Sequence, residues 1–303
     1  MPDLKINFCG IEFKNPVFTA SGTYGFGREF NALYPISLLG GISCKGTTLA
    51  PREGNPPPRI AETPSGILNS VGLQNPGVEH FINEDLPWLL EQKTGIIVNI
   101  AGSTVEEYCE MAERLSETAV DIIELNISCP NVKHGGAAFG TSCASVTEIT
   151  GEVKKHCTKP LMVKLSPNVT SIADIAKSAE AAGADALSLI NTIMAMRIDI
   201  ETRRPILKNN KGGLSGPAVL PVAIRMVNEV ANAVNLPIMG MGGISDWRDA
   251  LEMLLAGASA VQVGTILFND PLAPIKIIDG LNRYLKSHGI ARVSELTGAV
   301  QLW

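Results

Sequence analysis

Eight short apolar or β-branched runs recur along this chain of 303 residues, and most of them precede a segment of helical length. Several runs are apolar almost without interruption, as expected for parallel strands that are covered on both faces. Eight such strands alternating with helices predict an α/β fold, a (β/α)8 TIM barrel forming a single domain over residues 1–303. The predicted strands are 17–20, 41–44, 96–100, 122–126, 161–165, 186–190, 238–241 and 260–263.

The segments between the runs carry signals for the starts and ends of helices. Thr104 and Glu107 have the spacing of a capping box, and either Ser142 or Ser145 is expected to cap a later helix. Gly183 is placed to end a helix as its C′ residue. The predicted helices are 104–117, 142–157, 171–182, 217–234, 246–256 and 274–288.

Two stretches interrupt the alternation. Residues 49–74, rich in Pro and Gly, follow the second strand, and residues 193–215 follow the sixth. Both are expected to be long loops at the C-terminal rim of the barrel. Loops at that rim commonly act as lids or as walls of a substrate site.

Composition and charge argue against several classes of protein. A net charge of −5 without a basic block does not favour binding to nucleic acid or to anionic membranes. No apolar run reaches the ~18 residues of a membrane span, and the polar N-terminal residues do not form a signal peptide. The six cysteines include no C-x-x-C pair, so no zinc or iron–sulfur site is expected on this chain. We therefore predict a soluble cytoplasmic protein.

The most distinctive motif for function is Asn-Ile-Ser-Cys-Pro-Asn at residues 126–131, where a predicted strand gives way to a loop. It places the thiol of Cys129 between the carboxamides of Asn126 and Asn131. A thiol at the mouth of a rigid element, beside polar groups that hold a ligand, can act as a base or nucleophile. The alternative is a small buried hydrophobic residue, the usual role of a free cysteine. His134 is a loop residue rather than a base partner on this interpretation.

Polar residues and glycines gather where the other predicted strands end, the side of a barrel that carries catalysis. Glycines after strands seven and eight let backbone N–H groups approach an anion, which indicates a phosphate site. The strand-end lysines also permit an aldolase that forms a Schiff base, and asparagines can simply serve turns. The strand-end residues include Ser21, Gly22, Lys45, Gly46, Thr47, Asn99, Lys164, Asn191, Thr192, Gly242, Gly243, Gly264 and Thr265.

These motifs make the chain similar to the class 1 dihydroorotate dehydrogenases, most closely the catalytic subunit of the class 1B type. The resemblance covers nearly the whole chain, and the loop at 131–140 looks like that of class 1B. The motifs are ASG at 20–22, SCKGT at 43–47, LNSVGLQN at 68–75, NISCPNVK at 126–133, VKLSPN at 163–168, GGLSG at 212–216 and GMGGI at 240–244.

The resemblance implies an FMN-containing barrel that oxidises dihydroorotate to orotate in pyrimidine biosynthesis. Cys129 would remove the C5 proton while hydride passes from C6 to N5 of FMN. The residues expected to bind substrate are Lys45, Asn69, Val71, Gly72, Leu73, Asn126, Asn131, Asn191 and Thr192. Those expected to bind FMN are Ala20, Ser21, Gly22, Lys45, Gly46, Thr47, Asn99, Asn126, Lys164, Ile190, Gly216, Gly242, Gly243, Gly264 and Thr265.

The class 1B resemblance also implies a partner. FAD and a [2Fe–2S] cluster would reside on an electron-transfer subunit that passes electrons to NAD, and a homodimer of this chain would join two such subunits in a heterotetramer. The alternatives are a class 1A-type enzyme that uses fumarate, a related dihydropyrimidine dehydrogenase, and a flavin-binding paralogue without activity.

Overall fold

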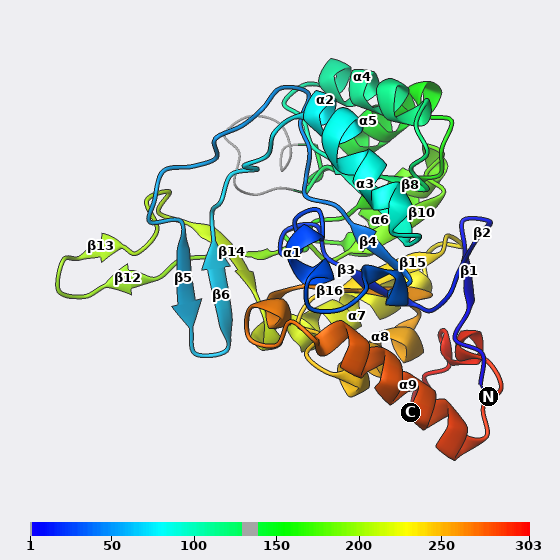
Figure 1. Ribbon diagram of the computed structural model, residues 1–303. Helices are drawn as coiled ribbons and strands as arrows, with labels where there is room; N and C mark the ends of the chain where they lie inside the picture. The colour runs from blue at the N-terminus through cyan, green and yellow to red at the C-terminus, as the bar shows by residue number, and fades with distance from the viewer. Residues whose placement is uncertain (1, 129–138) are drawn as a thin grey trace.

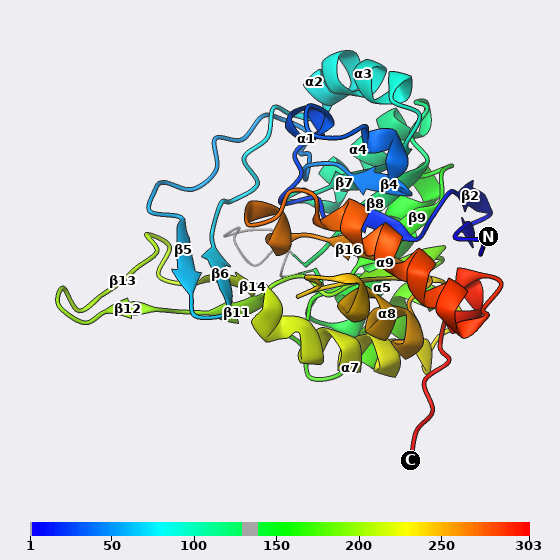
Figure 2. The ribbon, with the colours of Figure 1, turned by 60° about the horizontal axis from the view of Figure 1, so that its bottom comes forward.

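A computed structural model describes residues 2–128 and 139–303. Eight parallel strands close into a barrel in which each strand pairs with its neighbours in chain order, and the last returns to the first (Figures 1 and 2). The predicted barrel is therefore confirmed. Its strands are β3 (Val17–Thr19), β4 (Gly41–Ser43), β7 (Gly95–Ile100), β8 (Ile122–Asn126), β9 (Leu161–Lys164), β10 (Ala186–Leu189), β15 (Ile238–Met241) and β16 (Ala260–Val263).

The strands are buried on both faces, which explains their nearly continuous apolar sequence. Every residue of β8, β9, β10, β15 and β16 is buried. One face packs under the surrounding helices and the other fills the barrel interior. The barrel strands also carry polar residues that are at most 1% exposed: Thr19, Ser43, Asn99, Glu124, Ser188 and Gln262.

Helices cover the outside of the barrel (Figure 1). Helix α4 shows why: Tyr108, Met111, Ala112 and Leu115 recur at helical spacing and are all buried. A π-helical turn at Phe81–Asp85 joins α2 to α3. The helices are α1 (Arg28–Asn31), α2 (Val78–His80), α3 (Leu86–Glu91), α4 (Val105–Ser116), α5 (Cys143–His156), α6 (Ile172–Ala181), α7 (Leu220–Ala231), α8 (Trp247–Ala256) and α9 (Ala273–His288).

The expected helix boundaries agree with the capping contacts. The hydroxyl of Thr104 accepts a hydrogen bond from the backbone N–H of Glu107, 3.3 Å away. Of the two serines considered for α5, Ser142 is the cap, since its hydroxyl accepts from the backbone N–H of Ser145. Gly183 follows α6 with φ +95°, a conformation that a side chain disfavours.

The two long rim segments are not irregular, contrary to the sequence-based expectation. They form a four-stranded antiparallel sheet, here called the rim sheet, in the order β11 (Ile193–Ala195), β14 (Gly212–Ser215), β6 (Gly66–Asn69) and β5 (Ile60–Thr63). A second pair, β12 (Ile198–Asp199) and β13 (Arg204–Pro205), projects beyond it (Figure 1). Asn69 pairs with Gly213, which is 144 residues away, so a local pattern could not reveal the pairing.

A hairpin not expected from the sequence lies near the other end of the barrel. Its strands are β1 (Ile6–Phe8) and β2 (Ile11–Phe13), joined by Cys9 and Gly10 at positive φ. Phe13 packs edge-on against Phe18, with the ring centroids 5.1 Å apart. Among the described residues, no helix is both long and apolar enough to cross a membrane.

Candidate active site

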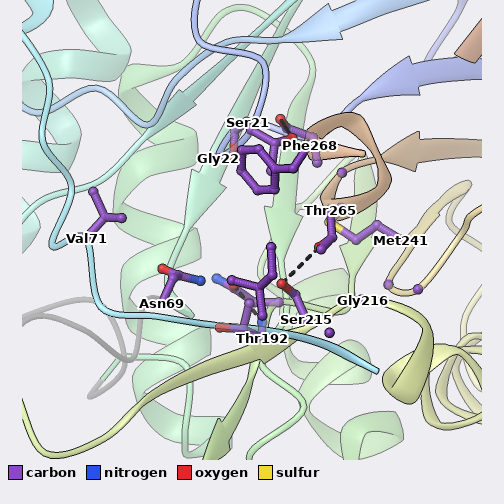
Figure 3. Close-up of a pocket in the computed structure, with 18 of the residues that line it drawn as sticks. Ser21, Gly22, Asn69, Val71, Thr192, Ser215, Gly216, Met241, Thr265 and Phe268 are labelled. Atoms are coloured by element: carbon purple, nitrogen blue, oxygen red, sulfur yellow. Dashed lines mark hydrogen bonds between the residues drawn. The ribbon is translucent and has the colours of Figure 1, made fainter. Parts of the chain in front are cut away.

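A cavity of about 720 Å³ lies between the C-terminal ends of the barrel strands and the rim sheet. All eight barrel strands contribute residues to its wall, either from the last residues of the strand or from the segment that follows it. Figure 3 shows Ser21, Gly22 and Phe268 on one side of this cavity and Asn69 and Thr192 on the other. The hydroxyl of Thr265, after β16, lies 2.9 Å from that of Ser215 and so joins the barrel wall to the rim sheet.

The predicted site residues within the described ranges come together around this cavity, with one exception. Cys129 and Asn131 lie outside the described residues, as does His134. The residues that line the cavity are Ala20, Ser21, Gly22, Lys45, Gly46, Asn69, Val71, Gly72, Leu73, Asn99, Asn126, Lys164, Ile190, Asn191, Thr192, Gly216, Gly242, Gly243, Gly264 and Thr265.

The exception is Thr47, expected to contact FMN, which is fully buried and does not line the cavity. Its hydroxyl donates to the carbonyl of Lys45 at 2.9 Å, and its backbone pairs with Ile100 of the neighbouring strand. Thr47 therefore supports the backbone that presents Lys45 and Gly46, and its expected contact with FMN stays a prediction.

Sequence reasoning missed the group at the centre of the barrel, the carboxylate of Glu124. It is completely buried, and four side chains donate hydrogen bonds to it. The only sequence signal was one acidic residue inside an apolar strand. We call Glu124 and its neighbours the polar floor, a set that contains Ser43, Asn99, Glu124, Lys164, Ser188 and Gln262.

Lys164 connects the polar floor with the cavity. Its side chain is 6% exposed and its Nζ lies 3.9 Å from Oε2 of Glu124. A buried ammonium group is tolerated only where an opposite charge or hydrogen bonds compensate for lost hydration. Since Lys164 also lines the cavity, it offers positive charge to a ligand there.

A buried acceptor also lies at the cavity wall. Gln262 lines the cavity and is 1% exposed; its Nε2 donates to Glu124, while its Oε1 has no hydrogen-bond partner among the residues that the structure describes. Buried polar atoms in native proteins are rarely unsatisfied, so a free acceptor at a cavity wall suits a bound donor. A flavin ring carries such a donor together with acceptors suited to Lys164.

Glycines form the wall at the end of β3 and beyond β15. Gly22 lines the cavity, and a Cβ atom added to it would meet no atom within 4 Å. Gly242 and Gly243 have φ +120° and +80°, a backbone that side chains disfavour. These residues fit a cofactor with a planar ring and a phosphate better than a metal; among the described residues no cluster of His, Cys, Asp or Glu could hold one.

Two of the described cysteines have surroundings that disfavour the thiolate form. Burial raises the pKa of the Cys44 thiol, although Cys44 precedes Lys45 at the end of β4. Burial also raises the pKa of Cys9, to about 12. A thiolate is needed for base or nucleophilic chemistry, so neither thiol suits that role.

Comparison with known proteins identifies the family. Residues 3–285 match the family model described as dihydroorotate dehydrogenase. Proteins named dihydroorotate dehydrogenase B (NAD(+)), catalytic subunit, are similar over their full length. That of Bacteroides fragilis is 55% identical over 303 residues, covering 100% of both chains. That of Alkaliphilus metalliredigens is 55% identical over 298 residues, covering 98% of this chain and 99% of the relative. This chain therefore belongs to the dihydroorotate dehydrogenase family.

Proposed function

We propose that this chain oxidises (S)-dihydroorotate to orotate, a step of pyrimidine (UMP) biosynthesis, using bound FMN. The observation that carries the proposal is that one cavity is lined by two lysines and several carboxamides: Lys45, Lys164, Asn99, Asn126 and Asn191. Uncharged amides and a lysine suit a planar ring that bears amide groups and a carboxylate. The names of the full-length relatives support the same activity.

For the cofactor, we propose one FMN per chain, with its ring beside Ser21, Gly22 and Lys164. The glycines at 242, 243 and 264, with Thr265, would hold its phosphate through backbone N–H groups. Bound FMN would supply the hydride acceptor, and the charge of Lys164 would favour the reduced form. The other proposed contacts are Ala20, Lys45, Gly46, Asn99, Asn126, Ile190 and Gly216.

For the substrate, we propose that Lys45 binds the carboxylate and that the carboxamides bind the ring. Cys129, in the segment that follows β8, is the proposed base that removes the C5 proton. A free thiol has a pKa near ~8.5, so a modest shift makes it usable near neutral pH. The remaining proposed substrate contacts are Asn69, Val71, Gly72, Leu73, Asn126, Asn131, Asn191 and Thr192.

The electron acceptor is proposed from the relatives. Their shared name, catalytic subunit, implies a second subunit, and it names NAD as the acceptor. We propose that this partner carries FAD and a [2Fe–2S] cluster, and that a homodimer of this chain joins two partners in the cytoplasm.

The test is an anaerobic half-reaction. The purified chain is loaded with FMN, its absorbance near ~450 nm is recorded, and dihydroorotate is added. Bleaching supports the proposal, and reoxidation by NAD with the partner, or by fumarate without it, then separates the class 1B and class 1A alternatives. A yellow protein that does not bleach contradicts it and favours another dihydropyrimidine or an inactive paralogue. A chain that takes up no FMN favours the aldolase, tested by borohydride trapping on Lys164.

Cofactor placement has its own test. Gly22→Ala adds a methyl group at the cavity wall, beside the proposed flavin ring, and is expected to weaken FMN binding by about tenfold, equivalent to ~1.4 kcal/mol. The Kd follows from titrating the apoprotein with FMN and recording flavin fluorescence. The matched control is Gly151→Ala in α5, where an added Cβ also meets nothing within 4 Å but lies far from the cavity wall. Equal FMN affinity in both variants would contradict the placement.

A further inference from the structure

The buried carboxylate of Glu124 has no role in the reaction proposed above, and Glu124 does not line the cavity. Its Oε1 accepts hydrogen bonds from Ser188 Oγ at 2.7 Å and Gln262 Nε2 at 3.2 Å. Its Oε2 accepts from Ser43 Oγ at 3.1 Å and Asn99 Nδ2 at 2.5 Å. Partners from four other barrel strands thus converge on one fully buried acceptor.

A row of polar side chains runs from Glu124 along the cavity wall. Asn99 donates its Nδ2 to Glu124, and its Oδ1 accepts from Asn126 Nδ2 at 3.1 Å. The Oδ1 of Asn126 accepts from Ser128 Oγ at 3.0 Å, and Ser128 Oγ accepts from Asn191 Nδ2 at 2.7 Å. Every donor in the row therefore points toward Glu124.

The row is held in one direction from both ends. A carboxamide carries a donor at one end and an acceptor at the other, so an isolated row of carboxamides and a hydroxyl can form in either direction. A carboxylate that only accepts requires Asn99 to present Nδ2 to it, which leaves Oδ1 of Asn99 for Asn126. In the same sense, Oδ1 of Asn126 accepts from the backbone N–H of Ser128 at 3.3 Å, and Oδ1 of Asn191 accepts from the backbone N–H of Thr192 at 2.7 Å. The direction decides which atoms of Asn126 and Asn191 remain for a ligand.

We propose that Glu124 is a positioning residue for substrate recognition: it orients the amide of Asn99 and so holds the inner end of the row Asn99–Asn126–Ser128–Asn191. The row is thereby set to bind a planar ring with the amide pattern of orotate and dihydroorotate. This inference rests on the proposed function for the identity of the ligand, and it extends that function to a residue that touches neither substrate nor cofactor.

The first test measures orotate binding to the FMN-loaded protein through the change in the flavin spectrum. Glu124→Gln keeps the shape but introduces a donor, so the amide of Asn99 can turn and Nδ2 of Asn126, which the backbone N–H of Ser128 holds in its present orientation, then loses its acceptor. We expect the Kd for orotate to rise between about tenfold and a hundredfold, the range for a hydrogen bond to a charged group. The matched control is Asp121→Asn, immediately before β8, where a partly buried carboxylate accepts from the backbone N–H of Ile96 outside the cavity. Its Kd is expected to stay within about twofold of the wild type.

A rescue variant separates direction from stability. In Glu124→Gln with Asn99→Asp, the carboxylate moves one position along the row, and the new glutamine can donate to it. Asn126 then again faces an acceptor, so we expect orotate affinity to recover by at least about fivefold relative to Glu124→Gln. The double variant has the same number of buried charges as the wild type. If Glu124→Gln alone does not fold, the Kd for orotate is measured in the double variant and compared with that of the wild type.

A double-mutant cycle measures the coupling between Glu124 and Asn191 in orotate binding. A carboxylate with only a structural role would show no such coupling. Asn191→Ala is measured in the wild-type and Glu124→Gln backgrounds. If the row is one unit, the loss of orotate affinity caused by Asn191→Ala shrinks by about fivefold or more in the second background.

Three outcomes are decisive. Wild-type protein that binds no orotate overturns the proposed function and this inference with it. If wild-type protein binds orotate, but the two substitutions of the cycle change its Kd independently and Asn99→Asp does not restore the affinity lost in Glu124→Gln, only the inference is overturned. An unchanged Kd in Glu124→Gln does the same.

Discussion

The cavity is closed by two regions built in opposite ways. The polar floor belongs to six barrel strands, and each of its residues is at most 5% exposed. The rim sheet is built from two segments that leave the barrel, and its outer strand β5 alternates between exposed and half-buried residues; Ile60 is 55% exposed. The floor is held by charge and side-chain hydrogen bonds, whereas the rim sheet is held by backbone pairing.

This difference in construction assigns different tasks to the two regions: one orients a bound ligand and the other covers it. A buried network with its groups satisfied resists rotation of any one member, because each lost hydrogen bond in a low dielectric is costly. A partly exposed sheet with few buried contacts opens at a lower free energy than a barrel core. We infer that the floor orients the ligand and that the rim sheet admits and covers it.

The largest effect is expected from removing the proposed base, a change that leaves both regions intact. Cys129→Ala should lower turnover by about 10²- to 10⁴-fold, the contribution typical of a general base. FMN and orotate should still bind, since floor and rim sheet are unchanged. The measurement combines the rate of anaerobic flavin reduction with an orotate titration. Loss of FMN in this variant would contradict the division of roles.

The matched replacement is Cys129→Ser. A hydroxyl ionises at a higher pH than a thiol, so its weak residual activity should rise as pH rises. Full activity at neutral pH would count against a thiol base.

The next largest effect is expected from removing the positive charge of Lys164 from the polar floor. Lys164→Met leaves the buried carboxylate of Glu124 without its cation and is expected to lower the free energy of unfolding by about 3 kcal/mol. Urea denaturation of the apoprotein measures it, and stopped-flow reduction of the loaded protein should be slower. In the double variant Lys164→Met with Glu124→Gln, part of the stability should return. A double variant less stable than Lys164→Met would show that the pair is not coupled in this way.

A smaller effect tests the rim sheet. A Cβ atom on Gly66 would lie 2.1 Å from the carbonyl oxygen of Ser215, so Gly66→Ala should separate β6 from β14. We expect the KM for dihydroorotate to rise about tenfold, equivalent to ~1.4 kcal/mol, with the barrel still folded. Gly151→Ala is again the control and should leave KM unchanged. A large loss of thermal stability in Gly66→Ala would show that rim sheet and barrel unfold together.

The smallest effect is expected beyond the rim sheet. Ile200, just after β12, is 81% exposed. Ile200→Ser should change the free energy of unfolding by no more than about 0.5 kcal/mol, because the side chain buries little surface. Thermal unfolding of the isolated chain checks this, and a clear destabilisation would indicate that the projecting pair contributes to the fold.

Local sequence was sufficient for the barrel and for most of the cavity wall. The helix at Val105–Ser116 follows from a cap and an apolar stripe, and the strand at Ile122–Asn126 from its apolar run. The rim sheet was missed because half of the residues of β14 are glycine and its partner β6 lies far away in the chain. Thr47 was expected beside the cofactor because it follows Lys45 and Gly46 at a predicted strand end and matches a family motif, whereas in the structure its hydroxyl turns back to the carbonyl of Lys45.

The sequence by itself therefore determined the alternation of strands and helices, and with it the end of the barrel at which Lys45, Asn99, Asn126 and Lys164 gather. These features depend on residues close together in the chain, through periodicity, caps and strand ends. Only the tertiary structure decided that Glu124 accepts from Ser43, Asn99, Ser188 and Gln262, and that two distant segments pair over the cavity. The closure of the barrel brings side chains from different strands within hydrogen-bonding distance. No local sequence pattern encodes which of them meet.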